Sequence, residues 1–186
     1  MNNNDRRVRK RKKALCEAIA KLLLDKDLRS ITVKELTDTA DVHRATFYSH
    51  YQDVYDLYEQ IEDSFVKEID AIIVNDPTHS YEKLYMLIIN YVYENAVLYK
   101  MFMGGNGNQS FTNRFRKLIE ENYLKIWLYE DNKSDISEEM RYFTTYHIQG
   151  CISIVTLWVM NDFAYPKESV LALLRKLNDH IDKILP

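Results

Sequence analysis

Polar side chains of the kinds that bind nucleic acids are concentrated between Arg44 and His50. A short helix over this stretch would present Arg44, Thr46, Tyr48 and His50 around its exposed side. Arginine binds guanine through two hydrogen bonds, threonine contacts a thymine methyl group or a phosphate, and tyrosine and histidine suit phosphates. The chemistry predicted for this stretch is recognition of DNA, without the making or breaking of a covalent bond.

The residue types that catalysis and metal binding require are not arranged for either. The sequence has no Gly-rich phosphate loop, no HExxH motif and no paired nucleophile and base, and its 5 histidines are scattered. Cys16 and Cys151 lack metal-ligand spacing and are predicted to be small buried residues, which fits a reducing cytoplasm. Adjacent carboxylates such as Glu120 and Glu121 are predicted to be solvated. We therefore expect no enzyme, no metal and no cofactor.

Charge divides the chain into two parts. Residues 1–52 carry 12 Lys or Arg against 7 Asp or Glu, whereas residues 53–186 carry 13 against 21. Because an acidic surface repels phosphate, only the first part is suited to bind nucleic acid. The basic segment Asp5–Lys13 is either a solvated arm or a phosphate contact, and both interpretations stay open. A helical adaptor whose basic head binds an acidic protein is the alternative to a DNA-binding protein.

Helices are expected throughout, because only 4 Gly and 3 Pro interrupt 186 residues of which 46% are apolar. Hydrophobic periodicity predicts an all-α protein of nine helices without a strand. The expected helices are Leu15 to about Lys26 and residues 33–40, 44–50, 53–74, 81–94, 96–103, 111–129, 137–161 and 166–184. The longest apolar-rich run, Gly150–Met160, is about half of a membrane span, and no signal peptide is visible, so a soluble protein is expected.

The second and third expected helices form a helix-turn-helix braced by the first. Thr32 followed by Glu35 is a capping box, in which each side chain accepts a hydrogen bond from the other residue's backbone. Asp41 and Val42 make a tight turn, and Phe47 is predicted to face inward from the third helix. Such a unit places its second helix in the major groove, which is about 12 Å wide.

The stretches 31–36 (ITVKEL) and 40–51 (ADVHRATFYSHY) closely resemble the signature of the TetR family of transcriptional regulators. The resemblance covers the whole head from residue 10 to residue 58. It implies a DNA-binding helix-turn-helix domain over residues 1–52 and an effector-binding and dimerisation domain over residues 53–186. It also implies a sequence-specific homodimer on double-stranded operator DNA, with repression of an inverted-repeat operator, relieved by an effector, as the commoner outcome.

The resemblance assigns roles position by position. Seven residues match DNA-contacting positions: Thr32, Lys34, His43, Arg44, Thr46, Tyr48 and His50. Lys34 and Arg44 match positions that read bases, whereas Phe47 and Tyr51 match core positions. The sequence departs from the family at the turn glycine, which is Asp41, and Asp tolerates a left-handed conformation better than most residues.

Two other departures affect expected contacts with DNA. His43 replaces the small polar residue that usually caps the third helix, and Val54 replaces a lysine at the start of the fourth. His43 is a poor cap but a candidate base or phosphate contact. The lost lysine removes one phosphate contact, for which the basic segment is a candidate replacement.

The body resembles the family loosely, and its partner stays open between two classes. Aromatic side chains suggest a pocket for a small apolar or aromatic effector, although ordinary packing in the core or at its rim is the simpler explanation of each single residue. The candidate pocket residues are Tyr91, Phe102, Phe115, Tyr123, Trp127 and His147. A weaker similarity to the subgroup of the dihydroxyacetone-kinase operon activator would instead imply a protein co-regulator.

The helix expected over residues 137–161 is apolar on more than one face, which predicts a second contact beyond its own core. With the last helix it would form a four-helix dimer interface, as the family resemblance also implies. The candidate interface residues are Gly150, Ile154, Leu157, Trp158, Leu174 and Leu177. A mid-helix Gly150 suggests close approach of another helix, from the partner subunit or from the same one.

Overall fold

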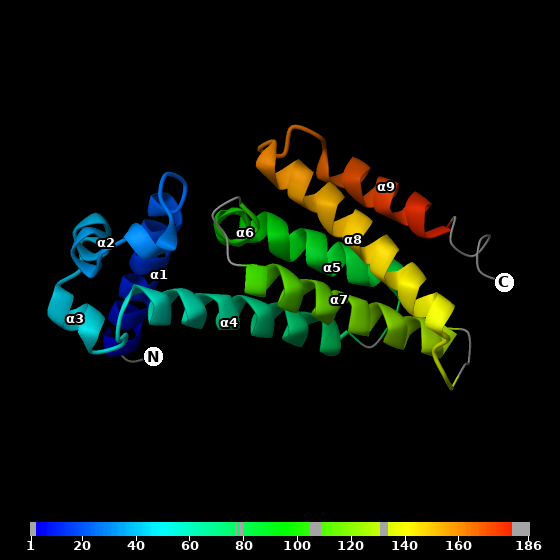
Figure 1. Ribbon diagram of the computed structural model, residues 1–186, viewed down its shortest axis with the longest axis horizontal. Helices are drawn as coiled ribbons and strands as arrows, with labels where there is room; N and C mark the ends of the chain where they lie inside the picture. Colours follow the sequence, from blue (N-terminus) through cyan, green and yellow to red (C-terminus); the bar gives the residue numbers. More distant parts are fainter. Residues whose placement is uncertain (1–2, 77, 79, 105–108, 131–133, 180–186) are drawn as a thin grey trace. The chain divides into compact units, whose positions relative to one another are not determined.

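The structure, a computed structural model, describes residues 3–76, 78, 80–104, 109–130 and 134–179 of the chain. Within these residues the protein is all-helical and contains no strand (Figure 1), which confirms the predicted fold class. The α-helices are α1 Asn3–Leu22, α2 Val33–Ala40, α3 Arg44–Tyr48, α4 Val54–Val74, α5 Tyr81–Glu94, α6 Ala96–Met103, α7 Gln109–Glu130, α8 Glu138–Met160 and α9 Lys167–Asp179. One 3-10 turn, Leu28–Ser30, precedes α2.

The helices form two units. The first comprises Met1–Phe65 and Val97–Asn108, and therefore holds α1, α2, α3, the first part of α4 and most of α6. The second comprises Val66–Ala96 and Gln109–Pro186, and holds the end of α4 together with α5, α7, α8 and α9. The first unit extends along α4 as far as Phe65. The domain boundary expected after residue 52 therefore falls inside this unit.

The first unit has a small core to which each of its helices contributes an apolar side chain. Ile19 of α1, Leu36 of α2 and Phe47 of α3 are fully buried. Phe102 of α6 packs edge-on against Tyr58 of α4, with 5.5 Å between the ring centroids. This core fixes α3 to the other helices of the head, so that the orientation of its exposed side chains is set by packing.

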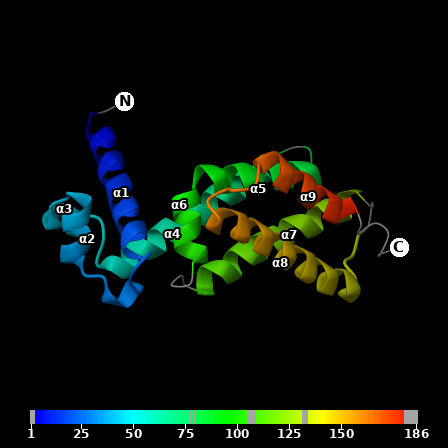
Figure 2. The same ribbon diagram turned by 90° about the horizontal axis from the view of Figure 1, so that it is seen from above.

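The second unit is a layered bundle in which α8 contacts both α7 and α9, and α5 contacts α9. Figures 1 and 2 show α8 and α9 side by side as an antiparallel pair. Ile89, Ile148 and Val159 are fully buried in this core. Burying such side chains away from water is the main force that holds the bundle together.

Both ends of α1 differ from the helix expected from the sequence. α1 begins at Asn3, well before its first buried residue, Leu15, so the basic segment is helical. α1 ends at Leu22 instead of near Lys26, because the backbone N–H groups of Leu24 and Asp25 bond carbonyls three residues earlier and tighten into a turn. The expected last residues of α9, up to 184, lie outside the described residues.

None of the helices in the described ranges is both long enough and apolar enough to cross a lipid bilayer.

Candidate nucleic-acid interface

The start of α2 is fixed by a threonine cap. Thr32 has extended backbone angles, and its Oγ1 accepts a hydrogen bond from the backbone N–H of Glu35 at 3.2 Å. This is the first half of the predicted capping box. The second half was predicted incorrectly, because the Glu35 carboxylate binds Nζ of Lys26 from the preceding loop. The ion pair ties the end of α1 to the start of α2.

The turn between α2 and α3 is closed by a left-handed residue. Asp41 has φ 52° and ψ 46°, which confirms the conformation expected where the family has glycine. The backbone N–H of Val42 bonds the carbonyl of Thr37 at 3.0 Å, the long-range bond of a Schellman motif. The turn thus satisfies the last carbonyls of α2 and directs the chain into α3.

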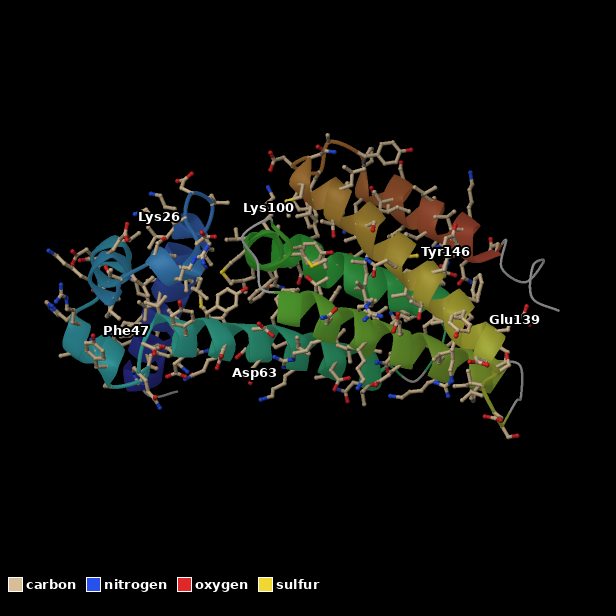
Figure 3. All side chains as sticks on the ribbon, in the orientation of Figure 1. Lys26, Phe47, Asp63, Lys100, Glu139 and Tyr146 are labelled. Atoms are coloured by element: carbon tan, nitrogen blue, oxygen red, sulfur yellow. The ribbon has the colours of Figure 1, made fainter. Side chains whose placement is uncertain are left out.

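α3 presents one apolar and one polar side. Phe47 is completely buried, and its ring lies 5.4 Å from that of Tyr51, which is also buried. Figure 3 shows Phe47 pointing from α3 into the head. Arg44 and His50 are exposed, and Tyr48 exposes 58% of its surface, although its ring edge contacts Phe47. The core roles expected for Phe47 and Tyr51 are confirmed.

All seven residues predicted to contact DNA lie in the first unit, on α3 or at the ends of α2 and α3. Thr46 is half-buried. The other six are exposed, namely Thr32, Lys34, His43, Arg44, Tyr48 and His50. His43 is the N-cap residue of α3 and makes no capping bond through its side chain, as expected. Its ring is therefore not committed to the helix end.

The connection from α3 to α4 is held by two carboxylates. Asp53 Oδ1 accepts from the backbone N–H of Asp56 at 2.9 Å, so Asp53 caps α4. Asp56 Oδ2 accepts from the backbone N–H of Gln52 at 2.8 Å, and this bond lowers the pKa of the exposed Asp56 carboxyl. Sequence reasoning missed this reciprocal arrangement, although an Asp three residues after an N-cap Asp is its signal.

The cysteine thiols are not suited to nucleophilic or redox chemistry. Burial raises the pKa of Cys16 to about 11 and that of Cys151 to about 12. Both are free thiols, and both stay protonated near neutral pH. Within the described residues, no group of His, Cys, Asp and Glu is arranged to hold a metal ion.

Comparison with known proteins identifies the family. A model of the C-terminal region of TetR-type transcriptional regulators matches residues 79–180, which is more than half of the chain. The chain belongs to the TetR family. The resemblance seen in the head is thus confirmed independently by the body.

Relatives of this TetR-family chain match it at low sequence identity. The HTH-type transcriptional regulator YxbF of Bacillus subtilis (strain 168) is 24% identical over 161 residues, or 83% of this chain. The chain spans only 41% of the length of that relative. The solved structure of the dihydroxyacetone kinase operon activator DhaS has a TM-score of 0.65 and 21% identity, covering 94% of this chain and 97% of its own. The solved structure of a TetR-family regulator from Streptomyces coelicolor has a TM-score of 0.64 and 15% sequence identity. The match covers 95% of this chain and 80% of the other.

The residues predicted for an effector pocket of this TetR-family protein are divided between the two units. Phe102 lies in the first unit, whereas Tyr91, Phe115, Tyr123, Trp127 and His147 lie in the second. Tyr91 is buried and donates to Oε2 of Glu68 at 3.0 Å, and Phe115 stacks on Phe111. Core packing thus accounts for both of these side chains.

Tyr123 and His147 belong to a buried polar cluster. The hydroxyl groups of Tyr85 and Tyr123 both donate to Oδ1 of Asn178, at 3.0 and 3.1 Å. His147 Nε2 lies 2.7 Å from the Tyr85 hydroxyl oxygen and 3.6 Å from Sγ of Cys151. Burial lowers the pKa of His147 to about 4, so its ring is neutral at pH 7. Sequence reasoning missed Asn178, for which no sequence pattern gave a signal.

The predicted interface residues divide between the surface and the core of the second unit. Gly150, Leu157 and Leu177 are exposed and Ile154 is half-buried. Trp158 and Leu174 are buried inside their own subunit, and Trp158 Nε1 donates to the carbonyl of Tyr165 at 2.7 Å. Trp158 and Leu174 are therefore not part of the exposed surface of this unit.

Proposed function

We propose that this TetR-family chain is a sequence-specific DNA-binding repressor that acts in the cytoplasm as a homodimer. On this proposal, α3 of each subunit enters a major groove of an inverted-repeat operator, and an effector releases the protein from DNA. The observation that carries the proposal is α3 itself. Its exposed side is polar, and Phe47 on its opposite side anchors it in the core.

The roles within the head follow from side-chain chemistry. Arg44, at the first position of α3, has the planar donor group that binds guanine O6 and N7. Tyr48 and His50 lie farther along the same segment and are assigned to phosphates. Lys34 and Thr32, at the start of α2, are assigned to a base edge and to a phosphate respectively. His43 is assigned to either kind of contact.

An exposed stripe on α8 supports the homodimer. Tyr142, Tyr146, Leu157 and Met160 expose 72%, 80%, 64% and 38% of their surfaces, and Figure 3 shows Tyr146 on the outer side of α8. Leu173 and Leu177 of α9 each expose a further 40%. Exposed apolar patches of this kind mark interaction sites, and a two-fold dimer covers the same patch on both subunits.

Gly150 lies in a groove within this stripe. The groove has a volume of about 720 Å³ and is bordered by Tyr146, Ile154 and Leu177 among others. A Cβ atom built on Gly150 would meet no atom within 4 Å, so a close contact inside the subunit does not explain this glycine. We assign the close approach to α8 of the second subunit.

A second cavity is the candidate effector site. It has a volume of about 490 Å³ and lies between the end of α4, α5 and α7, with Leu84, Leu87, Lys125 and Ile126 among its lining residues. Pockets for small molecules usually have volumes of about 300–1,000 Å³ and are mainly apolar. A small apolar or aromatic effector fits this description. Because α4 continues into the head, we assign to it the transmission of binding to α3.

A protein co-regulator is the second candidate for the partner of the body. The specific observations are the dense packing of Tyr91 and Phe115 and the fold shared with the activator DhaS. Thermal unfolding and Trp127 and Trp158 fluorescence would separate the alternatives in a ligand screen. A ligand that shifts both signals and weakens operator binding by about 1–3 kcal/mol supports the small effector. A screen without any such ligand favours the protein.

Retention on duplex DNA tests the proposed function. We expect binding that weakens steeply with salt and that favours one sequence over scrambled duplexes of equal length. A protein that binds acidic polypeptides equally well, without preference among duplexes, would instead be an adaptor.

A further inference from the structure

The amino-terminal turns of α1 carry a dense positive charge that the core of the head does not need. Seven of the eight residues from Arg6 to Lys13 are Lys or Arg, and none is acidic. All seven are exposed in the structure. The first fully buried residue of the helix is Leu15, so the preceding turns extend past the packed part of the head, as Figure 2 shows. We call residues 6–13 the basic extension.

Charge repulsion within the basic extension opposes its helical form. Residues three or four positions apart are neighbours on a helix surface, and like charges at this spacing are destabilising. Arg6 and Lys10, and Arg7 and Arg11, are such pairs. Positive charge near the amino terminus of a helix is also unfavourable toward the helix dipole. An external polyanion would relieve both effects.

The distribution of charge favours DNA over a lipid surface as that polyanion. A helix that lies on a membrane needs a broad apolar face opposite its basic one. Between Arg6 and Lys13 only Val8 is apolar, and cations point to all sides of the helix. A row of phosphates in a groove can be approached by cations on several faces, since neutralisation of phosphate needs no apolar contact.

The basic extension also belongs to the same unit as α3. α1 packs on α2, and α2 packs on α3, so the extension is rigidly linked to the helix proposed to enter the major groove. Its eight residues span about 12 Å at the usual helical rise.

From these observations we propose that the basic extension is a second DNA-contacting element. It binds phosphates beside the half-site read by α3 and contributes affinity without sequence preference. This inference rests on the proposed operator binding, and it also supplies the phosphate contact that is lost where Val54 stands at the start of α4.

Salt titration of a charge-neutralised variant tests the inference. Arg6→Gln, Arg7→Gln, Lys10→Gln and Arg11→Gln are combined, because glutamine retains helix propensity. The matched control combines Lys67→Gln, Arg114→Gln, Lys117→Gln and Lys176→Gln, four exposed residues of the second unit. Binding of a fluorescent operator duplex and of a scrambled duplex is measured from 50 to about 200 mM NaCl, the range over which phosphate contacts are strongly screened.

We expect the first variant to bind both duplexes more weakly by the same factor and to have a shallower salt dependence. Losing one contact in each subunit lowers the slope of log affinity against log salt by about 1.8. The control should keep the wild-type slope. An unchanged slope in the first variant, or a loss confined to the operator, would overturn the inference.

Two further arms separate failure of the inference from failure of the proposed function. Vesicles containing phosphatidylserine are added in place of DNA. Vesicle binding that requires the basic extension, with an unchanged DNA slope, would overturn the inference in favour of a lipid partner. The wild-type protein could show no sequence preference while the first variant still has a shallower slope of log affinity against log salt. That result would overturn the proposed operator recognition and would support the DNA contact of the basic extension.

Discussion

The Nε2 atom of His147 lies 2.7 Å from the hydroxyl oxygen of Tyr85, and both residues are buried. Tyr85 has a single hydroxyl proton, which it donates to Oδ1 of Asn178 at 3.0 Å. The histidine must therefore donate to the tyrosine oxygen, so its Nε2 carries the proton. This relationship links α8, α5 and α9 through neutral groups, and a positively charged imidazole there would be costly.

Acid should therefore weaken the second unit. The pKa of His147 is about 4 in the folded protein against 6.5 for an unperturbed histidine, so only the unfolded chain takes up this proton as the pH falls below 6.5. The stabilising contribution is complete above pH 6.5 and is lost toward pH 4. Urea titrations at pH 7 and pH 5 should show a loss of about 2 kcal/mol from this group.

The His147→Asn variant provides the control, because it cannot take up this proton. Its free energy of unfolding should fall less between pH 7 and pH 5 than that of the wild type. Tyr85→Phe should retain the wild-type pH dependence while losing about 1–3 kcal/mol at pH 7, since the buried Nε2–H then has no oxygen acceptor at its present position. Equal pH dependence in the wild type and His147→Asn would contradict a neutral buried histidine.

Arg44 and Tyr48 should differ in how they affect specificity. Arg44→Ala is expected to cost about 1–3 kcal/mol on the preferred operator and to relax selectivity at one base pair. Tyr48→Phe removes only a hydroxyl and should weaken all duplexes more evenly. Titrations against the operator and its single-substituted versions distinguish the two patterns. Lys117→Ala, an exposed change on α7, is the control. Uniform loss for Arg44→Ala would remove its role in reading a base.

The left-handed turn residue should respond to substitution in a characteristic order. Asp41 has φ 52°, which glycine adopts without strain and alanine does not. We expect Asp41→Gly to leave thermal stability unchanged or higher, and Asp41→Ala to lower it by roughly 1 kcal/mol. Differential scanning calorimetry measures both. An alanine variant as stable as the glycine variant would show that the turn relaxes to another conformation.

Two substitutions of Gly150 should distinguish the stability of the subunit from its dimerisation. A Cβ at this position meets open space within the subunit, and Ala gains about 1 kcal/mol over Gly in a helix. Gly150→Ala should therefore preserve the fold, whereas Gly150→Leu should push the subunits apart and lower operator affinity with helix content nearly intact. Sedimentation velocity at micromolar concentration measures the association.

Asn113→Leu provides the matched control for Gly150→Leu, because Asn113 is exposed on α7. This variant should sediment as the wild type does. A wild-type monomer, or a Gly150→Leu protein that dimerises and binds the operator normally, would exclude the proposed interface.

Local signals predicted the head well, because its geometry depends on short-range chemistry. Thr32 capping, the left-handed Asp41 and the inward Phe47 each follow from the residue type and its neighbours. The Lys26–Glu35 ion pair that replaces half of the capping box joins two segments, and no local pattern specifies it. The start of α1 was also missed, because apolar periodicity marks only the packed part of a helix.

The body was less predictable, because aromatic residues serve cores and pockets equally well. Composition grouped Phe102 with Tyr123, whereas tertiary packing places them in different units. Trp158 and Leu174 lie on helices that also carry an exposed apolar stripe, and only the packed structure shows which residues face the core. Periodicity alone cannot divide a helix that is apolar on more than one face.

Selection of bound duplexes from random DNA tests the central claim most directly. If two α3 helices related by a two-fold axis read the operator, the enriched sequences will contain an inverted repeat with half-site centres about one helical turn, or a multiple of it, apart. Arg44→Ala protein should enrich the same repeat with one position in each half-site relaxed. Enrichment of no sequence, or of a single site without two-fold symmetry, would contradict the account.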